Sequence, residues 1–245
     1  GLQIVQGGRL SGGFLSANSG ATVMGMFTVI ALANLIRRWR QGGGLGLFDH
    51  LTRVSVPLGY VLIFVTCLLL TASRMGVAAT LVAASVLMLW ELFDAKGGRM
   101  PILVAGGLLL LVGFVLLLGG NDLVWMRMDQ IGSDTLVRHD IFSAHWQAFL
   151  ASPLFGYGLG SFADVNSQIM SAESYRALWS IRAVHNVYLQ WLVEAGIVGA
   201  VPMFLLIAWI TGVAIWRSFR LRSGQTLMRG LVASSLVVLI HGTTD

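Results

Sequence analysis

The sequence predicts an all-α fold, a polytopic transmembrane helical bundle with one long polar loop. Hydrophobic residues make up 56% of the 245 residues and charged residues only 11%, against roughly 25% charged residues in soluble domains. The mean hydropathy is +0.78. The apolar residues also form blocks of about 17 to 20, the length at which a helix crosses a hydrocarbon core of roughly 30 Å. A surface of this kind requires lipid as its solvent.

Six apolar segments are expected to span the membrane. They are residues 21–36, 54–70, 77–92, 101–118, 197–216 and 227–240. Residues 1–118 would then hold four helices with short loops, residues 119–184 the long loop, and residues 185–245 the last two helices. Because the chain starts at Gly1 and its last apolar run is short, we expect a fragment of a longer protein with a truncated final span.

Basic residues gather in every second loop between these segments. The three groups are Arg37, Arg38, Arg40 and Arg53; Lys96 and Arg99; and Arg217, Arg220, Arg222 and Arg229. The positive-inside rule places these loops in the cytoplasm and therefore places the long loop outside. The net charge of +5 is thus explained by orientation signals and not by a nucleic-acid partner. A single cysteine, Cys67, excludes an intrachain disulfide.

The long loop carries most of the acidic residues and several arginines. Loops of this length are usually functional, and the apolar spacing predicts short helices that lie on the outer membrane surface. The glycine-rich stretch 156–160 follows no strand and precedes no lysine, so it is expected to be a turn and not a phosphate loop. His139, Asp140 and His145 have an irregular spacing that disfavours a metal site.

An apolar stretch runs with little interruption from His185 to Trp216. As one helix it would measure about 48 Å and exceed the thickness of a bilayer. A bend is therefore expected at Gly196, Gly199 or Pro202. Residues 185–194 would form the start of the helix at the outer interface. This puts His185 at the helix N-terminus, with Asn186 as a cap.

The string His185-Asn186, nine residues, then Gly196 and Gly199 resembles a motif of the bacterial O-antigen ligase and polymerase superfamily, and it is closest to the ligase branch. Further similar stretches follow the same order along the chain. They are residues 8–18, Ser73-Arg74, Arg138 followed by Trp146, and residues 152–158. The resemblance covers most of the chain. We expect the N-terminal helices of the family to be absent from this chain.

The resemblance implies a glycosyltransferase of the bacterial inner membrane, multi-pass, with its active face in the periplasm. Such an enzyme transfers a glycan from undecaprenyl diphosphate to an acceptor sugar with inversion, without a nucleotide sugar, a metal or another cofactor. We expect ligation of O-antigen to the lipid A core. Polymerisation of O-antigen or exopolysaccharide units and transfer to protein hydroxyls remain alternatives within the superfamily.

The candidate site residues suit this chemistry. Guanidinium groups bind diphosphate oxygens in pairs and keep their charge, so Arg74 and Arg138 are expected to hold the diphosphate. An imidazole can accept the proton of the acceptor hydroxyl near neutral pH, a role that falls to His185. Candidate supporting residues are Asn186, Arg182 and Glu194, with His241 and Asp245 behind them.

Simpler roles for these residues stay open. Arg74 can be an interfacial arginine that extends to the lipid headgroups, and Arg127, Arg176 or Arg182 can replace Arg138 as a phosphate ligand. Glu194 is expected near the outer hydrocarbon boundary, where it needs an arginine or water as a partner. From other classes, a small-anion transporter would carry charges in the middle of its spans, and a structural subunit would leave the polar loop unexplained.

Overall fold

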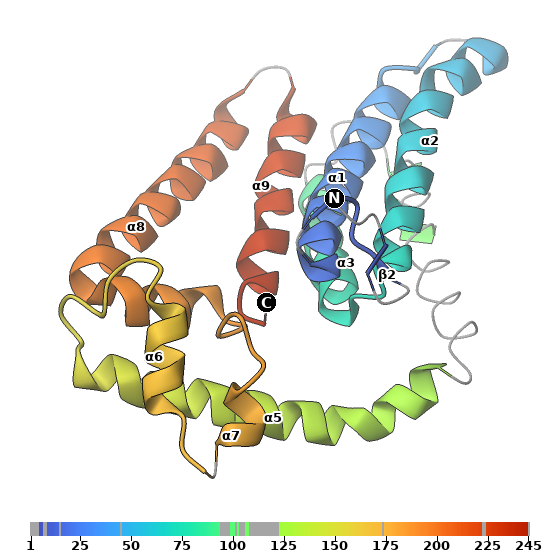
Figure 1. Ribbon diagram of the computed structural model, residues 1–245. Helices are drawn as coiled ribbons and strands as arrows, with labels where there is room; N and C mark the ends of the chain where they lie inside the picture. The colour runs from blue at the N-terminus through green and yellow to red at the C-terminus, as the bar shows by residue number, and fades with distance from the viewer. Residues whose placement is uncertain are drawn as a thin grey trace. The chain divides into compact units, whose positions relative to one another are not determined.

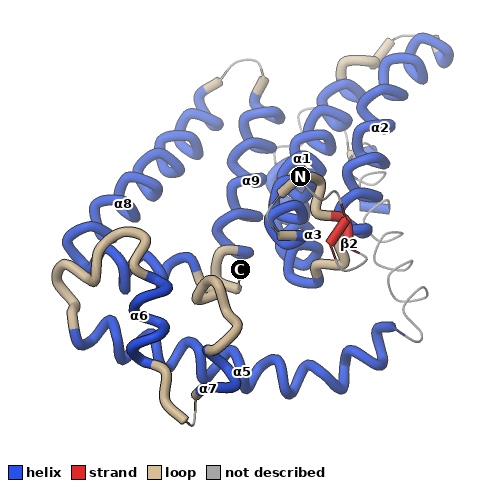
Figure 2. Tube along the Cα trace, viewed as in Figure 1, coloured by secondary structure: helices blue, strands red, loops and turns tan. Residues whose placement is uncertain are grey.

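The computed structural model describes residues 5–6, 9–14, 16–44, 46–93, 99–100, 102, 106–107, 123–172, 174–221 and 224–244. Most of this part of the chain is helical (Figures 1 and 2). The elements are β1 (Val5–Gln6), β2 (Arg9–Leu10), α1 (Ala17–Arg40), α2 (Leu47–Leu70), α3 (Arg74–Phe93), α5 (Leu123–Ala151), α6 (Phe162–Ile169), α7 (Tyr175–Leu178), α8 (Val187–Arg220) and α9 (Gln225–His241). β1 and β2 form a small antiparallel hairpin.

The chain folds into two compact units. The first, which we call the bundle unit, comprises Gly1–Phe114 and Thr211–His241; the second, the loop unit, comprises Val115–Ile210 and Gly242–Asp245. α8 is divided between the two at Ile210.

The predicted fold class is confirmed. Within the described residues, α1, α2, α3 and α8 are long and apolar enough to cross a membrane, and α9 is a shorter apolar helix. Five of the six expected segments lie inside these helices. The expected span at 101–118 falls mostly outside the described residues.

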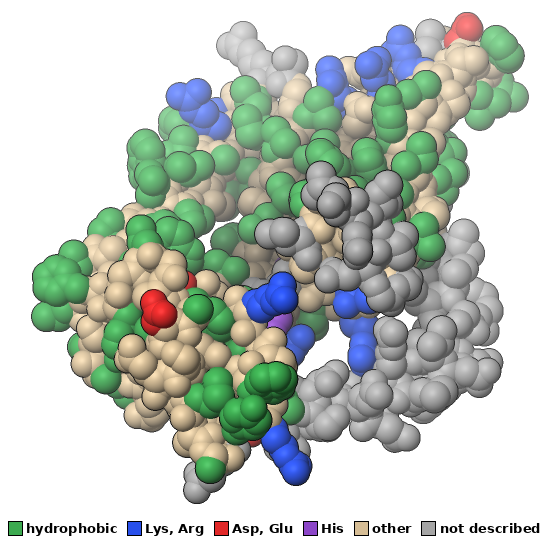
Figure 3. All heavy atoms as spheres, in the orientation of Figure 1, with side chains coloured by type: hydrophobic (Ala, Val, Ile, Leu, Met, Phe, Trp, Pro, Cys, Tyr) green, Lys and Arg blue, Asp and Glu red, His purple; other side chains and the backbone are tan. Residues whose placement is uncertain are grey.

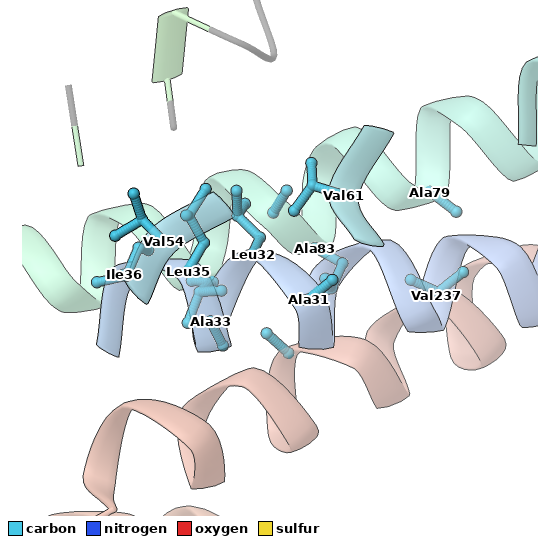
Figure 4. Packing of buried hydrophobic residues seen from close by; sticks show 14 residues of the cluster. Ala31, Leu32, Ala33, Leu35, Ile36, Val54, Val61, Ala79, Ala83 and Val237 are labelled. Atoms are coloured by element: carbon cyan, nitrogen blue, oxygen red, sulfur yellow. The ribbon is translucent and has the colours of Figure 1, made fainter. Parts of the chain in front are cut away.

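In the bundle unit, α1 packs against α2, α3 and α9. The core between them contains Leu32, Ile36, Leu87 and Val237, all at most 1% exposed (Figure 4). Glycines bring the backbones close together. A Cβ atom at Gly25 would lie 2.2 Å from the hydroxyl of Thr80, and a Cβ at Gly230 would lie 2.3 Å from the Cβ of Ala33. Close helix approach through small residues is the usual packing of membrane helices, because lipid gives no hydrophobic drive to associate.

A buried ionic cluster joins three helix ends in the bundle unit. The Glu91 side chain of α3 is fully buried and forms ion pairs with Arg40 of α1 and, at 3.2 Å, with Arg229 of α9. The hydroxyl of Thr226 donates a further hydrogen bond to Glu91 at 3.3 Å. The sequence suggested only an orienting role for Arg40 and Arg229. Burial of a carboxylate requires such partners, so this cluster fixes the ends of α1, α3 and α9.

The first described element of the loop unit is α5, a helix of 29 residues, which is longer than the short helices expected there. The two helices that follow, α6 and α7, are short. α5 ends at Ala151, just before Ser152 and Pro153, because a residue before proline disfavours the helical conformation. A second hydrophobic core, which includes Ile141, Leu178 and Val193, holds the unit together.

Candidate functional site

His185 has an unusual backbone conformation. Its φ angle is 59°, in the left-handed region, and in the described part of the chain only Ala72 shares this property among the residues other than glycine. Such a conformation costs about 1 to 3 kcal/mol and persists only where the surroundings impose it. The preceding residue, Val184, is fully buried, while the His185 side chain is half-buried. The chain therefore turns sharply at His185 to present it just before α8.

The N-terminus of α8 is capped as the sequence predicted. The side-chain oxygen of Asn186 accepts a hydrogen bond from the backbone N–H of Leu189 at 3.0 Å. The N–H of Val187 donates to the carbonyl oxygen of Gly242 at 2.8 Å. These bonds satisfy two N–H groups that a helix start leaves without partners. They also fix the residues that follow His185.

The side chains of Glu194 and Gln190 support the backbone just before His185. The Gln190 amide donates to one Glu194 oxygen at 3.0 Å, and the N–H of Gly160 donates to the other at 2.8 Å. The side-chain oxygen of Gln190 accepts from the N–H of Val184 at 3.4 Å. Within the described residues, the side chain of Glu194 thus bonds to an amide and a backbone N–H, where the sequence had left an arginine or water open as its partner. A line of hydrogen bonds runs from Gly160 to the residue before His185.

The expected bend in α8 occurs at Gly196, whose φ of 60° and ψ of −171° interrupt the helix. Gly199 and Pro202 lie in the helical part beyond it. A side chain is excluded at this point, because a Cβ atom at Gly196 would lie 2.3 Å from the carbonyl oxygen of Leu154. Only glycine combines this conformation with such a close approach.

The loop 152–160 supplies the hydrogen bonds that the break in α8 removes. Tyr157 and Gly158 donate to the carbonyl oxygens of Val193 and Glu194, at 3.0 and 2.8 Å. In return, Ile197 and Val198 donate to Pro153 and Leu154, at 2.8 and 3.0 Å. Two separate parts of the sequence motif thus form one structural element. The glycine-rich stretch is a turn, as expected, but spacing alone gave no sign that it docks on Gly196.

A groove of about 560 Å³ lies between α5 and α8 beside this turn. Its walls are mainly apolar, with Phe142 and Trp146 from α5 and Leu189 and Leu192 from α8. Its polar groups come from His139, Ser143 and Asn186. Asn186, the residue that follows the candidate catalytic His185, lines this groove, and His185 itself is not among the lining residues.

Two candidate arginines belong to the same unit as His185. Arg138 lies on α5, half-buried, one residue before the groove residue His139, and Arg182 lies exposed in the loop before His185. Among the described side chains, no carboxylate lies within 4.0 Å of either guanidinium group. Both are suited to bind an anion.

Arg74 belongs to the bundle unit, where it is the exposed first residue of α3. Ser73 caps this helix by accepting from the N–H of Gly76 at 3.2 Å. Its hydroxyl lies 3.4 Å from Nε2 of the buried His241, whose other ring nitrogen hydrogen-bonds to Thr22. A cation beside helix N–H groups is typical of an anion site. Asp245, the expected companion of His241, lies outside the described residues.

The hairpin arginine Arg9 supports the turn that precedes Arg74. Its Nε donates to the carbonyl oxygen of Thr71 at 2.8 Å, and a terminal nitrogen donates to the side chain of Asn18 at 2.9 Å. The stretch 8–18 of the sequence motif thus holds the 71–74 turn in place. Its role was not predictable from spacing.

The two histidines of α5 lie in different environments. His139 and Asp140 are exposed, with 3.7 Å between their nearest side-chain atoms. His145 is fully buried; its Nδ1–H donates to the carbonyl of Ile141 at 2.9 Å, and its ring stacks on Phe162. Burial lowers the pKa of His145. The described residues contain no group of three or more histidine, cysteine or acidic side chains that could hold a metal ion.

A family model described as O-antigen ligase matches residues 59–204. The match covers more than half of the chain and includes Arg74, Arg138, His185 and Gly196. No curated protein matches the chain.

Proposed function

Since the chain belongs to the O-antigen ligase family, we propose that it transfers a glycan from undecaprenyl diphosphate to the lipid A core. Membership confirms the resemblance found in the sequence and implies a lipid-linked glycan and a glycan acceptor as substrates in general. The reaction and its particular donor and acceptor are our proposal. The main support is His185, which a strained turn presents at the capped start of α8 beside a groove.

His185 acts as the general base in this proposal. Its imidazole takes the proton of an acceptor sugar hydroxyl, whose oxygen forms a bond to the anomeric carbon of the donor. The bond from that carbon to the diphosphate breaks, and the diphosphate leaves with the electron pair, which inverts the anomeric centre. Imidazole suits the task because its ordinary pKa is near the ambient pH. The hydrogen bonds around Val184, Asn186 and Val187 hold it ready.

Arg74 and Arg138 bind the diphosphate in this proposal. The leaving group carries its negative charge at the membrane surface, and a guanidinium group contacts two phosphate oxygens at once without losing its proton. Charge on the diphosphate increases as the glycosidic bond breaks, so these contacts strengthen in the transition state. Arg182, near His185 in the sequence, is a further candidate ligand. Asn186 and Glu194 act indirectly, through the backbone around His185.

The proposed location is the bacterial inner membrane, with the site on the periplasmic face. The chain is a multi-pass membrane protein by its apolar helices, and its arginine-rich ends obey the positive-inside rule with one orientation. That orientation puts the Ser73-Arg74 turn and His185 on the periplasmic side. Both substrates are lipids, so they reach the site within the membrane plane.

The test uses the full-length protein reconstituted with undecaprenyl-diphosphate-linked O-antigen and lipid A core. We expect transfer in the presence of a chelator, loss of transfer in His185→Ala, and normal transfer in the control His50→Ala. His50 lies at the arginine-rich end of the bundle unit, away from Arg74, and its ring contacts Trp39. Transfer by His185→Ala at the normal rate would overturn the role of His185. Lengthening of the glycan, or its attachment to protein, would identify the polymerase or the protein-glycosylating reaction instead.

A further inference from the structure

A second pocket lies at the arginine-bearing end of the bundle unit, between α1 and α2. It has a volume of about 720 Å³. α1 contributes Asn34 and Arg38, and the first half of α2 contributes Asp49, Arg53, Val56 and Tyr60, among others. Arginine side chains gather where α1 ends and α2 begins, and hydrophobic side chains cover the helices beyond them (Figure 3). Nothing in the proposed transfer reaction uses this pocket.

Opposite charges line the pocket without neutralising one another. Arg38, Asp49 and Arg53 are all exposed, and within the described residues no ion pair of 4.0 Å or less joins the carboxylate to either guanidinium group. Arg53 instead donates to the carbonyl oxygen of Gln41 at 3.0 Å, which fixes it over the turn between the helices. Unpaired charges of both signs around one pocket complement a ligand that itself carries both.

Asp49 has a simpler role as well, since an acidic residue in the first turn of α2 interacts favourably with the helix dipole. This role accounts for a carboxylate at the helix start. It does not account for two guanidinium groups, one from each helix, on the walls of the same pocket. The combination therefore points to a ligand.

The pocket changes from polar to apolar along α2. Asp49 to Tyr60 spans about 16 Å of helix axis, which exceeds the roughly 5 to 7 Å of headgroup region beside the hydrocarbon core. Val56 is 60% exposed and Tyr60 49% exposed on this face, and Ile63 continues it at 56%. A ligand in the pocket thus meets charges at one end and an exposed apolar helix face at the other.

We propose that this pocket binds a glycerophospholipid whose headgroup carries a phosphate and a primary ammonium, such as phosphatidylethanolamine. The phosphate lies between Arg38 and Arg53, because guanidinium groups bind phosphate oxygens strongly. The ammonium contacts Asp49, and one acyl chain follows Val56 and Tyr60. Basic pockets between membrane helices commonly hold lipid headgroups. The proposal is independent of the transfer reaction and of the site around His185.

The test measures lipid retained by the delipidated full-length protein in detergent, by native mass spectrometry. Phosphatidylethanolamine, phosphatidylglycerol and phosphatidylcholine with identical acyl chains are compared. We expect phosphatidylethanolamine to be retained best. Arg38→Ala and Arg53→Ala should each lower its retention about fivefold, and Asp49→Asn should lower retention of phosphatidylethanolamine but not of phosphatidylglycerol.

The matched control is Arg217→Ala with Arg220→Ala, which removes two exposed arginines of α8 in the same unit that do not line the pocket. Its lipid retention should be unchanged, and the helical content and melting temperature of every variant should match the parent. Preferential retention of phosphatidylglycerol, or stronger binding of all lipids by Asp49→Asn, would overturn the proposal in favour of a general basic surface. Full displacement of the lipid by millimolar inorganic phosphate would also overturn it, because the site would then bind phosphate and not lipid.

Discussion

The bundle unit and the loop unit satisfy their buried polar groups in different ways. In the bundle unit, side chains from different helices meet, as Glu91 does with Arg40 and Arg229 and as His241 does with Thr22 and Ser73. In the loop unit, backbone groups meet, since the 152–160 turn and the broken helix around Gly196 exchange four hydrogen bonds. A side-chain cluster depends on residue type, whereas a backbone exchange depends on conformation and on the absence of a Cβ atom.

This difference has a functional meaning for the proposed site. The backbone exchange holds the 152–160 loop against α8 without side chains, and Asn186, Gln190 and Glu194 add side-chain hydrogen bonds to the backbone around His185. The Glu91 cluster, in contrast, uses all of its charged groups for structure. We therefore expect the reaction to take place in the part of the chain that backbone hydrogen bonds hold in position.

The largest effect is expected in the side-chain cluster. Glu91→Ala leaves Arg229, which is 3% exposed, buried without its carboxylate. Loss of one partner from a buried ion pair costs about 3 to 5 kcal/mol, so we expect this decrease in the free energy of unfolding. Thermal unfolding in detergent measures it. Asp164→Ala, which removes an exposed carboxylate, is the control and should change stability by less than about 0.5 kcal/mol; an equal loss in both variants would contradict a structural role for the cluster.

A side chain at position 196 should disrupt the four backbone hydrogen bonds between α8 and the 152–160 loop. Gly196→Ala places a Cβ atom against the carbonyl of Leu154 and forces alanine into a left-handed conformation, at an expected cost of about 2 to 3 kcal/mol. Glycan transfer should fall with it, since α8 then no longer holds His185. The measurement is unfolding together with transfer activity.

Gly212→Ala offers a matched control in the same helix. No atom lies within 4 Å of a Cβ at Gly212, so alanine should stabilise α8 by about 0.5 to 1 kcal/mol through its better helix propensity. If both glycine variants behave alike, the special role of the break at Gly196 is wrong.

The sequence predicted the bundle better than the site, for a physical reason. Apolar blocks report which segments cross lipid, and the cap at Asn186 and the break at Gly196 follow from local rules on side-chain oxygens and glycine conformations. The partner of Glu194 and the docking of residues 152–160 depend on long-range contacts that spacing does not encode. Glu91 did leave a signal, because an ionisable residue inside an apolar segment requires a partner.

Glu194 tests whether the hydrogen-bonded line to Val184 positions His185. Glu194→Ala removes the acceptors of Gln190 and Gly160, so the turn loses its support. Because small displacements of a reacting group lower the rate strongly, we expect kcat for transfer to fall by about tenfold or more with little change in KM. Glu194→Gln keeps one acceptor and should restore part of kcat.

A positioning role also predicts an unchanged pH profile of kcat in Glu194→Ala, because His185 remains the base. A shifted profile would mean that Glu194 itself exchanges protons during the reaction. A parallel rise in KM would instead place Glu194 in substrate binding.

The smallest effect is expected for His145, whose side chain is buried in the loop unit. Burial lowers its pKa in the folded protein below the ordinary value near 6.5, so at mildly acidic pH the unfolded chain binds more protons than the folded chain. The stability gained from the neutral, buried ring is therefore present above pH 6.5 and is lost as the pH falls below it. Melting temperatures at pH 7.5, 6.5 and 5.5 should decrease in that order.

His145→Phe preserves an aromatic ring against Phe162 but cannot bind a proton. We expect the variant to lose the part of the pH dependence that the native protein shows between pH 7.5 and 5.5. If acidification lowers the melting temperature of the variant by the same amount, other groups cause the effect.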